Sequence, residues 1–464
     1  MRLVFKFGGT SLGDGERIKR CSSLVKSYYE QGNGIVVVCS AMGDTTDILI
    51  AMMNAAVKGD RGAVEGYLRA LRDAHLAAAL EVVSDGELRT ETVQLLNERL
   101  NDLTHILSSI YFLREVTQRS KDLVLSFGER LSTWIFTSTL RGLGIPAKYF
   151  EGGDAGIITD SDFGYATPIL DETIENIGKT LLPHLSEGVV PVVTGFIGRT
   201  RDGAITTLGR GGSDLTATLL GSGIGADEVV LWSDVDGLLT TDPRIVKTAK
   251  TIPQLSYEEA LEMAVFGAKG LHPRAIETAQ KFGIKVRIKN TFNPSAPGTL
   301  ITTHGVSTGS VVKSVLLVRD VAMITVKGSS VIGRPGSAAK VLQSLSDAGI
   351  NVMMISQSVS ESSVSLIVRR DCADRALEAI KGSSPAGAIR GIECERDVVV
   401  LAVVGEGMKG TPGVASRVFG AVAKRGVNVR MIAQGSSELN ISFVVKEADG
   451  FEAVRAIHED YGLS

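Results

Sequence analysis

The sequence has few aromatic residues and no excess of charge of either sign. Aromatic residues make up 5% of the 464 residues, and the formal net charge is −3 at pH 7. A chain without a basic excess lacks the electrostatic footprint of proteins that bind nucleic acid or anionic membranes. The shortage of aromatic side chains also leaves little surface on which bases would stack. We therefore expect no nucleic-acid partner and no membrane partner.

Cysteine and histidine are also scarce, with 4 and 6 residues. Cys21, Cys39, Cys372 and Cys394 show no paired spacing, so we expect no disulfide framework or zinc site and assign no metal ligands. No apolar run approaches the roughly 20 residues of a membrane span. The N-terminus reaches a lysine and two glycines before an apolar core forms, which predicts no signal peptide. These absences predict a cytoplasmic protein.

Glycine is abundant, with 52 residues, and one glycine pair follows the first apolar run, in the segment Lys6–Ser11 (KFGGTS). Adjacent glycines let the backbone approach a ligand closely, and a helix start beside a lysine attracts anions. The segment therefore predicts a phosphate-binding turn. It is not a Walker A loop, because the lysine precedes the glycines and the four-residue spacer is missing. An ordinary strand-to-helix turn is the alternative interpretation.

A second glycine pair lies in Gly209–Asp214 (GRGGSD), immediately before an apolar stretch with helical composition. The glycines would expose the amides of the helix N-terminus to an anion, and Arg210 would clamp a carboxylate or phosphate. Alternatively, Ser213 or Asp214 only caps the helix. Two such turns in one domain favour an anion site.

Further polar residues stand next to predicted strands and helices. Ser40 and Thr46 follow the second apolar run, and Ser233 and Asp234 follow a later one. Ligands bind at the carboxyl ends of strands in open α/β sheets, although hydroxyl residues also form turns. Glu129 opens a predicted helix, where it would hold an ammonium group or only complement the helix dipole.

Runs of β-branched residues predict buried strands between helical stretches, at residues 35–40, 189–194, 229–232 and 285–288. Such runs are typical of a parallel sheet covered on both faces. Apolar residues spaced three and four apart predict an amphipathic helix over 93–110. The first 300 residues are therefore expected to form an α/β domain with a mostly parallel central sheet covered by helices.

The C-terminal third contains an internal repeat. Residues 319–321 match 396–398 at an offset of 396 − 319 = 77 residues, and further identities follow without a gap. Such a repeat indicates two copies of one module. A βαββαβ module needs a closing strand after its second helix, and the second copy reaches Ser464 without one. We therefore predict that one copy borrows its last strand and that the strands of the two modules are interleaved. The predicted domains are a catalytic domain at 1–300, a linker at 301–310, and modules at 311–388 and 389–464.

Together these segments resemble the aspartate kinases of the amino-acid kinase family. The motifs occur in the family's order over nearly the whole chain: KFGGTS at 6–11, SFGERLS at 126–132, GRGGSD at 209–214, TTDPR at 240–244 and GAKGLHP at 267–273. The repeat is similar to the tandem ACT modules of these enzymes, which have a ferredoxin-like fold. The resemblance implies ATP-dependent phosphorylation of the L-aspartate side-chain carboxylate to 4-phospho-L-aspartate, the first step towards lysine, threonine and methionine.

The resemblance also implies roles for individual residues. Lys6 would neutralise charge on the transferring phosphoryl group, and Asp214 would orient this lysine as the second catalytic residue. The nucleotide would contact Lys6, Phe7, Gly8, Gly9, Ser11, Ser233, Asp234, Leu239, Arg244 and Lys269. The aspartate would contact Ser40, Thr46, Glu129, Arg210, Gly211, Gly212 and Ser213, with Glu129 on its ammonium group. Mg²⁺ is implied by ATP and not by a ligand motif.

The ACT modules imply feedback by an amino acid and pairing between chains, so we expect a homo-oligomer. The strand ends at 355–357 and 432–434, followed by serine-rich turns, resemble threonine-sensitive family members, which favours threonine over lysine as the effector. The effector would contact Asn351, Gln357, Asn428 and Gln434. Alternatively, these side chains only satisfy backbone groups.

Two other functions are compatible with parts of the sequence. A sister kinase acting on glutamate, N-acetylglutamate or UMP would share the glycine turns but not the ACT pair. A non-catalytic amino-acid sensor would keep the ACT pair but would not need Lys6, Arg210 and Asp214, which are all present.

Overall fold

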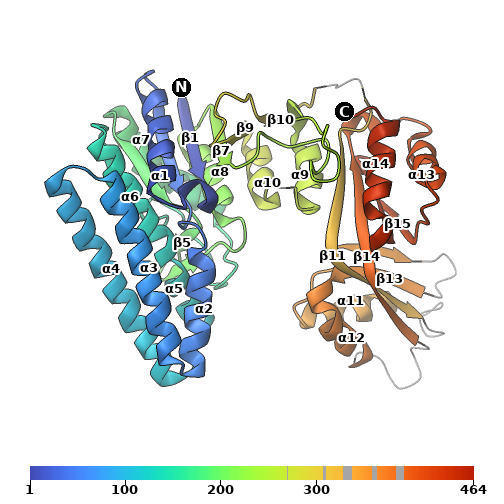
Figure 1. Ribbon diagram of the computed structural model, residues 1–464, viewed down its shortest axis with the longest axis horizontal. Coiled ribbons are helices and arrows are strands. Elements are labelled where there is room, and N and C mark those ends of the chain that lie inside the picture. Colours follow the sequence, from blue (N-terminus) through green and yellow to red (C-terminus); the bar gives the residue numbers. More distant parts are fainter. Residues whose placement is uncertain (269, 307–309, 328–336, 358–362, 383–390) are drawn as a thin grey trace. The chain divides into compact units, whose positions relative to one another are not determined.

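The computed structural model describes residues 1–268, 270–306, 310–327, 337–357, 363–382 and 391–464. The chain divides into two compact units, coloured along the sequence in Figure 1. The first unit contains residues 1–238, 253–261 and 269–305. The second contains residues 239–252, 262–268 and 306–464.

An eight-stranded sheet forms the centre of the first unit. In order across the sheet, its strands are β3 (Ala147–Phe150), β4 (Val190–Thr194), β2 (Gly34–Cys39), β1 (Arg2–Phe7), β7 (Glu228–Ser233), β9 (Val286–Asn290), β10 (Thr299–Thr302) and β8 (Gln254–Ser256). All neighbouring strands run parallel except β9 and β10. The sequence prediction of a mostly parallel sheet is therefore confirmed.

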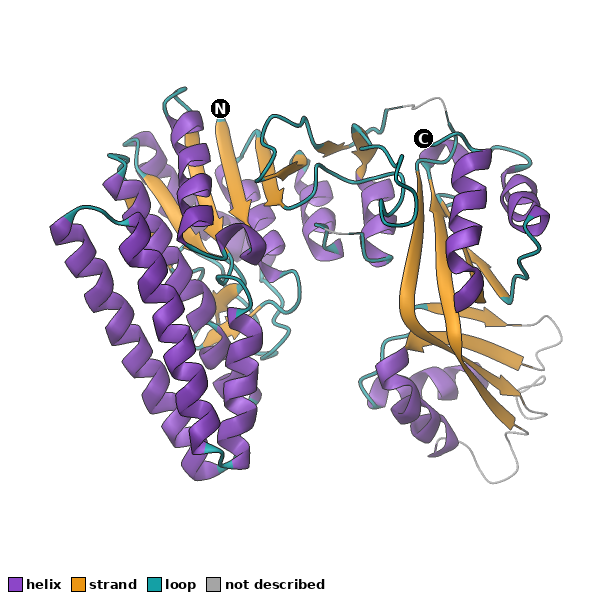
Figure 2. Cartoon of the chain, viewed as in Figure 1, coloured by secondary structure: helices purple, strands orange, loops and turns teal. Residues whose placement is uncertain are grey.

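Helices pack against both faces of this sheet (Figures 1 and 2). Helices α7, α8 and α10 lie side by side, while α1 and α6 pack on the other face beneath the long α3 and α4. The helices are α1 (Gly15–Tyr29), α2 (Thr45–Lys58), α3 (Arg61–Val82), α4 (Gly86–Leu113), α5 (Gln118–Leu125), α6 (Phe127–Gly142), α7 (Leu170–Ser186), α8 (Gly212–Ile224), α9 (Tyr257–Val265) and α10 (Pro273–Phe282). A small hairpin of β5 (Ile197–Arg199) and β6 (Ile205–Thr207) completes the unit.

Alternating side chains of β1 fix the position of the first glycine turn. Leu3, Phe5 and Phe7 are buried in the core shared with α1 and α6. The Phe7 ring stacks on Trp232 of β7 with ring centroids 6.2 Å apart. Because side chains alternate along a strand, Lys6 points away from this core. The strand therefore holds its lysine at the sheet's carboxyl edge on a rigid support.

The second unit is built on a six-stranded antiparallel sheet. In order across the sheet, its strands are β12 (Met354–Gln357), β13 (Ser363–Arg369), β11 (Ser314–Lys327), β14 (Gly391–Val404), β16 (Asn440–Lys446) and β15 (Met431–Gln434). Its helices are α11 (Ser337–Asp347), α12 (Ala373–Gly382), α13 (Val414–Lys424) and α14 (Gly450–Asp460). Figure 2 shows the two long strands running through both halves of this unit.

The internal repeat reappears as two equivalent βαββα sets of elements. Helix α13 begins 414 − 337 = 77 residues after α11, which is the offset found in the sequence. The long strands serve both sets: residues 321–327 of β11 pair with β13, whereas residues 314–318 pair with 400–404 of β14. Residues 314–318, at the start of the predicted first module, thus provide the fourth strand of the second set.

The division into units differs from the expected boundary at residue 300. Residues 239–252 and 262–268 belong with the C-terminal modules, because Ile245 and Phe266 pack into apolar clusters of the second unit. The expected linker at 301–310 also begins inside β10.

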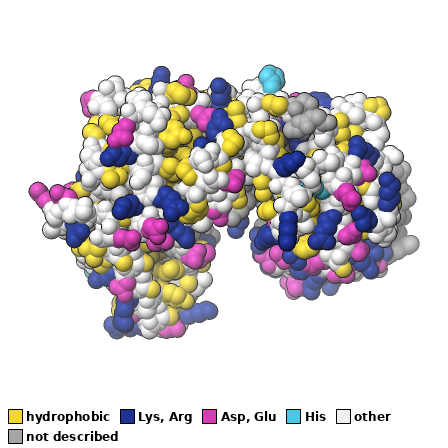
Figure 3. Space-filling view, turned by 45° about the horizontal axis from the view of Figure 1, so that its top comes forward, with side chains coloured by type: hydrophobic (Ala, Val, Ile, Leu, Met, Phe, Trp, Pro, Cys, Tyr) yellow, Lys and Arg dark blue, Asp and Glu magenta, His cyan; other side chains and the backbone are white. Residues whose placement is uncertain are grey.

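On the face drawn in Figure 3, basic and acidic side chains are interspersed.

Candidate active site

The first glycine turn packs tightly against the loop that follows β2. A Cβ atom at Gly9 would lie 3.0 Å from the carbonyl oxygens of both Ala41 and Gly43. The Gly43 amide donates to the Gly9 carbonyl at 3.1 Å. The close approach explains the glycine, because any side chain would push the two loops apart. The turn then continues into a 3-10 helix over Gly9–Leu12.

An ion pair joins the two glycine turns. The Lys6 ammonium lies 2.6 Å from Oδ1 of Asp214, and the two side chains are only 15% and 12% exposed. Asp214 lies in the first turn of α8, and no side chain caps this helix within the described structure. The alternative interpretation of Asp214 as a simple cap is therefore wrong. The two residues assigned to catalysis lie together at the sheet edge.

The second glycine turn has a backbone that requires its glycines. Gly209 and Gly211 have φ angles of 75° and 72°, on either side of Arg210. A Cβ atom at Gly209 would lie 2.4 Å from the Tyr165 ring, and one at Gly211 would lie 2.1 Å from the His272 ring. Burial lowers the pKa of His272, so its ring is neutral at pH 7. The histidine therefore supports the turn as a structural side chain.

Glu129 is a buried carboxyl group in the first turn of α6. Its Oε1 accepts a hydrogen bond from the Ala41 amide at 3.2 Å, and no hydrogen bond to Oε2 is formed by the described residues. Burial raises the pKa of Glu129 from 4.5 to about 8, although the Ala41 amide and Lys6 oppose the shift. A buried acid without a full set of partners is typical of a ligand site.

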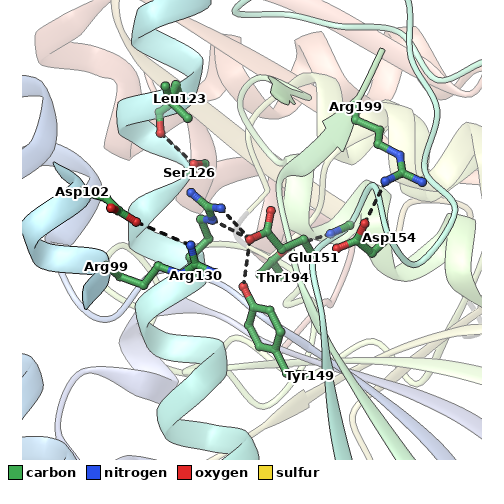
Figure 4. Close-up of polar contacts among 11 residues, drawn as sticks. Arg99, Asp102, Leu123, Ser126, Arg130, Tyr149, Glu151, Asp154, Thr194 and Arg199 are labelled. Atoms are coloured by element: carbon green, nitrogen blue, oxygen red, sulfur yellow. Dashed lines mark hydrogen bonds and ion pairs between the residues drawn. The ribbon is translucent and has the colours of Figure 1, made fainter. Parts of the chain in front are cut away.

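Arg130, the next residue along α6, fixes this helix to the end of β3 (Figure 4). Its Nη2 atom lies 2.7 Å from Oε1 of Glu151, and the Tyr149 hydroxyl donates to the same oxygen at 3.5 Å. Both charged side chains are largely buried, which strengthens such a pair relative to an exposed one. The pair therefore stabilises the helix that carries Glu129.

These groups surround one cavity of about 500 Å³. The cavity is lined by both residues assigned to catalysis and by all seven assigned to aspartate: Lys6, Asp214, Ser40, Thr46, Glu129, Arg210, Gly211, Gly212 and Ser213. Ammonium, guanidinium and hydroxyl groups line it together with the buried carboxyl group of Glu129. The arrangement fits a small molecule with both carboxylate and ammonium groups.

Other cavity residues were not found from the sequence. They are Asp47, Ile50, Lys121, Leu125, Gly164, Phe196 and Thr207, whereas Gly209 belongs to the second glycine turn. Lys121 adds a third basic side chain to the cavity. Its neighbour Asp122 is fully buried and accepts hydrogen bonds from Gly164 and Thr207. The only sequence signal was an adjacent Lys-Asp pair shortly before SFGE, a pattern that surface helices share.

The residues assigned to the nucleotide are spread over several segments. The Phe7 ring is buried and the Ser11 hydroxyl bonds that of Thr291 at 2.8 Å, so we expect both to reach a ligand through their backbone. The Ser233 hydroxyl, at the end of β7, donates to Asp234 at 3.3 Å. Leu239 and Arg244 belong to the second unit, where the exposed Arg244 guanidinium forks onto Asp242. Lys269 lies outside the described residues.

A metal site built by the protein alone is not seen in the described part of the chain. No group of three or more His, Cys, Asp or Glu side chains there could hold a metal ion. No helix of the described ranges is both long and apolar enough to cross a bilayer.

Comparison with known proteins assigns the chain to a family. The model of the amino acid kinase family matches residues 1–290, and an ACT domain model matches residues 324–383 and 401–461. Aspartokinase 1, chloroplastic, of Arabidopsis thaliana is 36% identical over 467 residues, which cover 99% of this chain and 80% of that protein. The chain belongs to the aspartate kinases.

Solved structures of aspartate kinases agree with this assignment. Escherichia coli aspartokinase III in complex with aspartate and ADP (R-state) superposes with a TM-score of 0.84 at 31% identity, covering 99% of both chains. The same enzyme with lysine and aspartate (T-state) gives a TM-score of 0.81 at 30% identity, again covering 99% of both chains. The family assignment excludes the alternative of a sister kinase, and relatives named aspartokinases support catalysis over a non-catalytic amino-acid sensor.

Proposed function

We propose that this aspartate kinase transfers the γ-phosphoryl group of ATP to the side-chain carboxylate of L-aspartate, giving 4-phospho-L-aspartate and ADP. A carboxylate oxygen forms the new bond to phosphorus, and the bond to the bridging oxygen breaks with its electrons moving to ADP. The carboxylate is already ionised at pH 7, so no general base is needed. One observation carries the proposal: the Lys6–Asp214 pair, Glu129 and Arg210 line a single cavity.

Lys6 lowers the electrostatic barrier between two anions. In the proposed complex its ammonium group and the amides of Gly8 and Gly9 face the phosphates, while Asp214 holds the ammonium in place. Such preorganised charges act most strongly where water is excluded. Mg²⁺ bound with ATP would supply further charge neutralisation, and Asp214 is the carboxylate at the turn that would face it. Ser233, Asp234, Leu239, Arg244 and Lys269 are proposed to bind the rest of the nucleotide.

The charged residues of the cavity would orient aspartate. Arg210 and Ser213 are proposed to hold carboxylate oxygens, with the backbone of Gly211 and Gly212 behind them. Glu129 is proposed to accept the α-ammonium group through its unpartnered Oε2. Ser40 and Thr46 would contact the substrate from the opposite loop.

Trapping with hydroxylamine tests the reaction directly. Hydroxylamine converts an acyl phosphate into a hydroxamate, so the product is expected only when ATP and L-aspartate are both present. Mg²⁺ is tested in the same assay by chelation with EDTA and by adding the metal back. Hydroxamate formation from glutamate at an equal rate, or none from aspartate, would contradict the proposed substrate.

We further propose that the ACT modules bind an amino-acid effector, threonine rather than lysine, in a homo-oligomer. The side chains of Asn351, Gln357, Asn428 and Gln434 are all exposed in the single chain, as an interface site requires. The exposure disfavours the alternative that they only satisfy buried backbone groups. The lysine complex of the Escherichia coli enzyme makes lysine the competing ligand.

Calorimetry decides between the two effectors. We expect titration of threonine to release or absorb heat and to inhibit hydroxamate formation. Gln434→Ala is expected to weaken both effects without changing basal activity. Heat with lysine and none with threonine would overturn the preference, and sedimentation of the chain as a monomer would contradict the oligomer. The compartment in which the enzyme works stays a prediction, and the relatives from Arabidopsis thaliana are named chloroplastic.

A further inference from the structure

The turn that carries Arg210 is supported from outside the cavity by Arg274. This residue lies at the start of α10, and its guanidinium donates to the Leu208 carbonyl at 2.7 Å and to the Ala166 carbonyl at 3.0 Å. The same group lies over the Tyr165 ring, 4.6 Å from its centroid. Arg274 thus joins the segment before Arg210 to the loop whose tyrosine packs on Gly209.

The local helix does not explain an arginine at this position. A cation in the first turn of a helix is disfavoured by the helix dipole. Arg274 nevertheless lies in the first turn of α10, half-buried, with its donors directed at carbonyl groups of two other segments. Its planar fork suits two acceptors at once, which a lysine would not reproduce.

A buried carboxyl group also holds the loop that carries Tyr165 and the strand before Arg210. Asp122 accepts from the Gly164 amide at 2.9 Å, from the Thr207 amide at 2.9 Å and from the Thr207 hydroxyl at 2.8 Å. Thr207, Gly209 and Arg210 line the cavity. Asp122 and Arg274 together therefore fix the backbone of Thr207 and Leu208, just before Gly209 and Arg210.

We propose that Arg274 is a positioning residue for aspartate binding, acting through Arg210. Its two hydrogen bonds hold residues 208–210 against Tyr165, so that the Arg210 guanidinium is presented to the substrate carboxylate without first paying the entropy of ordering the turn. The inference rests on the proposed function, in which Arg210 binds aspartate.

Steady-state kinetics of Arg274→Lys tests the proposal. The lysine reaches only one carbonyl, so we expect the KM for aspartate to rise about tenfold, the scale of one lost hydrogen bond to a charged donor. The KM for ATP is expected to change less than about twofold. The matched control is Arg287→Lys. Arg287 makes two hydrogen bonds to Glu228 in the same unit, so this variant also loses a forked pair, but it should leave both KM values unchanged.

A double-mutant cycle with Arg210→Ala separates positioning from general destabilisation. If Arg274 acts through Arg210, adding Arg274→Lys to Arg210→Ala leaves the KM for aspartate unchanged. If the effects of the two substitutions on the aspartate KM are additive, or if the KM for ATP rises equally, the positioning role of Arg274 is overturned while the role of Arg210 stands. An Arg210→Ala variant with normal aspartate KM would instead refute the proposed role of Arg210 itself.

A second variant keeps the test valid if Arg274→Lys folds poorly. Tyr165 is 52% exposed, so Tyr165→Ala is expected to fold while removing the ring that packs on Gly209. We expect it to raise the KM for aspartate about threefold, again without an effect on ATP. An unchanged aspartate KM in this variant would also contradict the proposal.

Discussion

Aspartate binding is expected to depend on pH through Glu129. The raised pKa of about 8 means that most of the ligand-free enzyme carries a neutral Glu129 at pH 7. An ammonium group binds the carboxylate, so the proton must leave before or during binding. The apparent KM then contains the factor 1 + 10^(pKa − pH), which is roughly 100 at pH 6, about 11 at pH 7 and about 2 at pH 8.

Initial rates of hydroxamate formation at several aspartate concentrations measure this factor. We expect the KM for aspartate to fall about tenfold per unit between pH 6 and 7 and to level off above pH 8, while the KM for ATP stays nearly constant. Glu129→Gln should have a higher KM that no longer depends on pH. Glu151→Gln is the control, because Glu151 pairs with Arg130 outside the cavity and should leave the slope intact. A flat wild-type profile from pH 6 to 8 would refute the reasoning.

The raised pKa of Glu129 also affects stability. The direction is opposite to that of most carboxyl groups, whose pKa is lowered in the folded state. The folded-state pKa of Glu129 lies above its ordinary 4.5, so the native state keeps a proton that the unfolded state releases between pH 4.5 and 8. The free energy of unfolding of the ligand-free enzyme therefore falls as pH rises through this window, by at most about 1.4 kcal/mol per unit. Saturating aspartate should remove much of this fall.

Three further predictions concern single side chains. Lys6→Ala should lower kcat at least about 100-fold in the hydroxamate assay, and a loss below about tenfold would exclude its electrostatic role. Lys121→Met should raise the KM for aspartate about fivefold, the scale expected for loss of one partly exposed cation. Lys121→Arg should restore the wild-type KM. If both variants and the wild type have the same kinetics, Lys121 does not belong to the site. Burial lowers the pKa of His75 from 6.5 to about 4. The free energy of unfolding, measured with urea, should therefore fall by up to about 3 kcal/mol on acidification from pH 6.5 to 4. His75→Gln should lack this loss and the exposed His105→Gln should retain it; identical acid sensitivity of both variants would contradict the assignment.

Local patterns predicted much of the active site because its chemistry is local. The Lys6–Ser11 and Gly209–Asp214 segments each contain glycines, a cation or an anion, and a helix start within six residues. Two such turns in one domain favoured an anion site, and the ion pair of Lys6 with Asp214 joins them in the structure. Periodicity and the 77-residue repeat likewise predicted the sheet and the paired modules.

Residues whose role depends on distant packing were missed. Lys121, Asp122 and Arg274 stand in ordinary helical sequence, and only the folded chain brings them to the cavity or to the turn beside it. The membership of residues 239–252 in the second unit had no sequence signal either. It depends on Ile245 entering a core formed by residues more than 60 positions away, such as Val312.

The position of residues 239–252 in the second unit suggests how an effector bound to the ACT modules would influence catalysis. Residues 239–252 directly follow the β7 segment that carries Ser233 and Asp234, and they contain Leu239 and Arg244 of the proposed nucleotide site. Yet Thr240 bonds His458 of α14 at 2.9 Å, and its carbonyl accepts from Val315 of β11 at 2.9 Å. Because β11 is shared by both modules, a rearrangement of either one would move Val315 and the segment that it holds. Feedback then requires two states of this unit with different affinities for the effector, and residues 239–252 connect the unit covalently to β7.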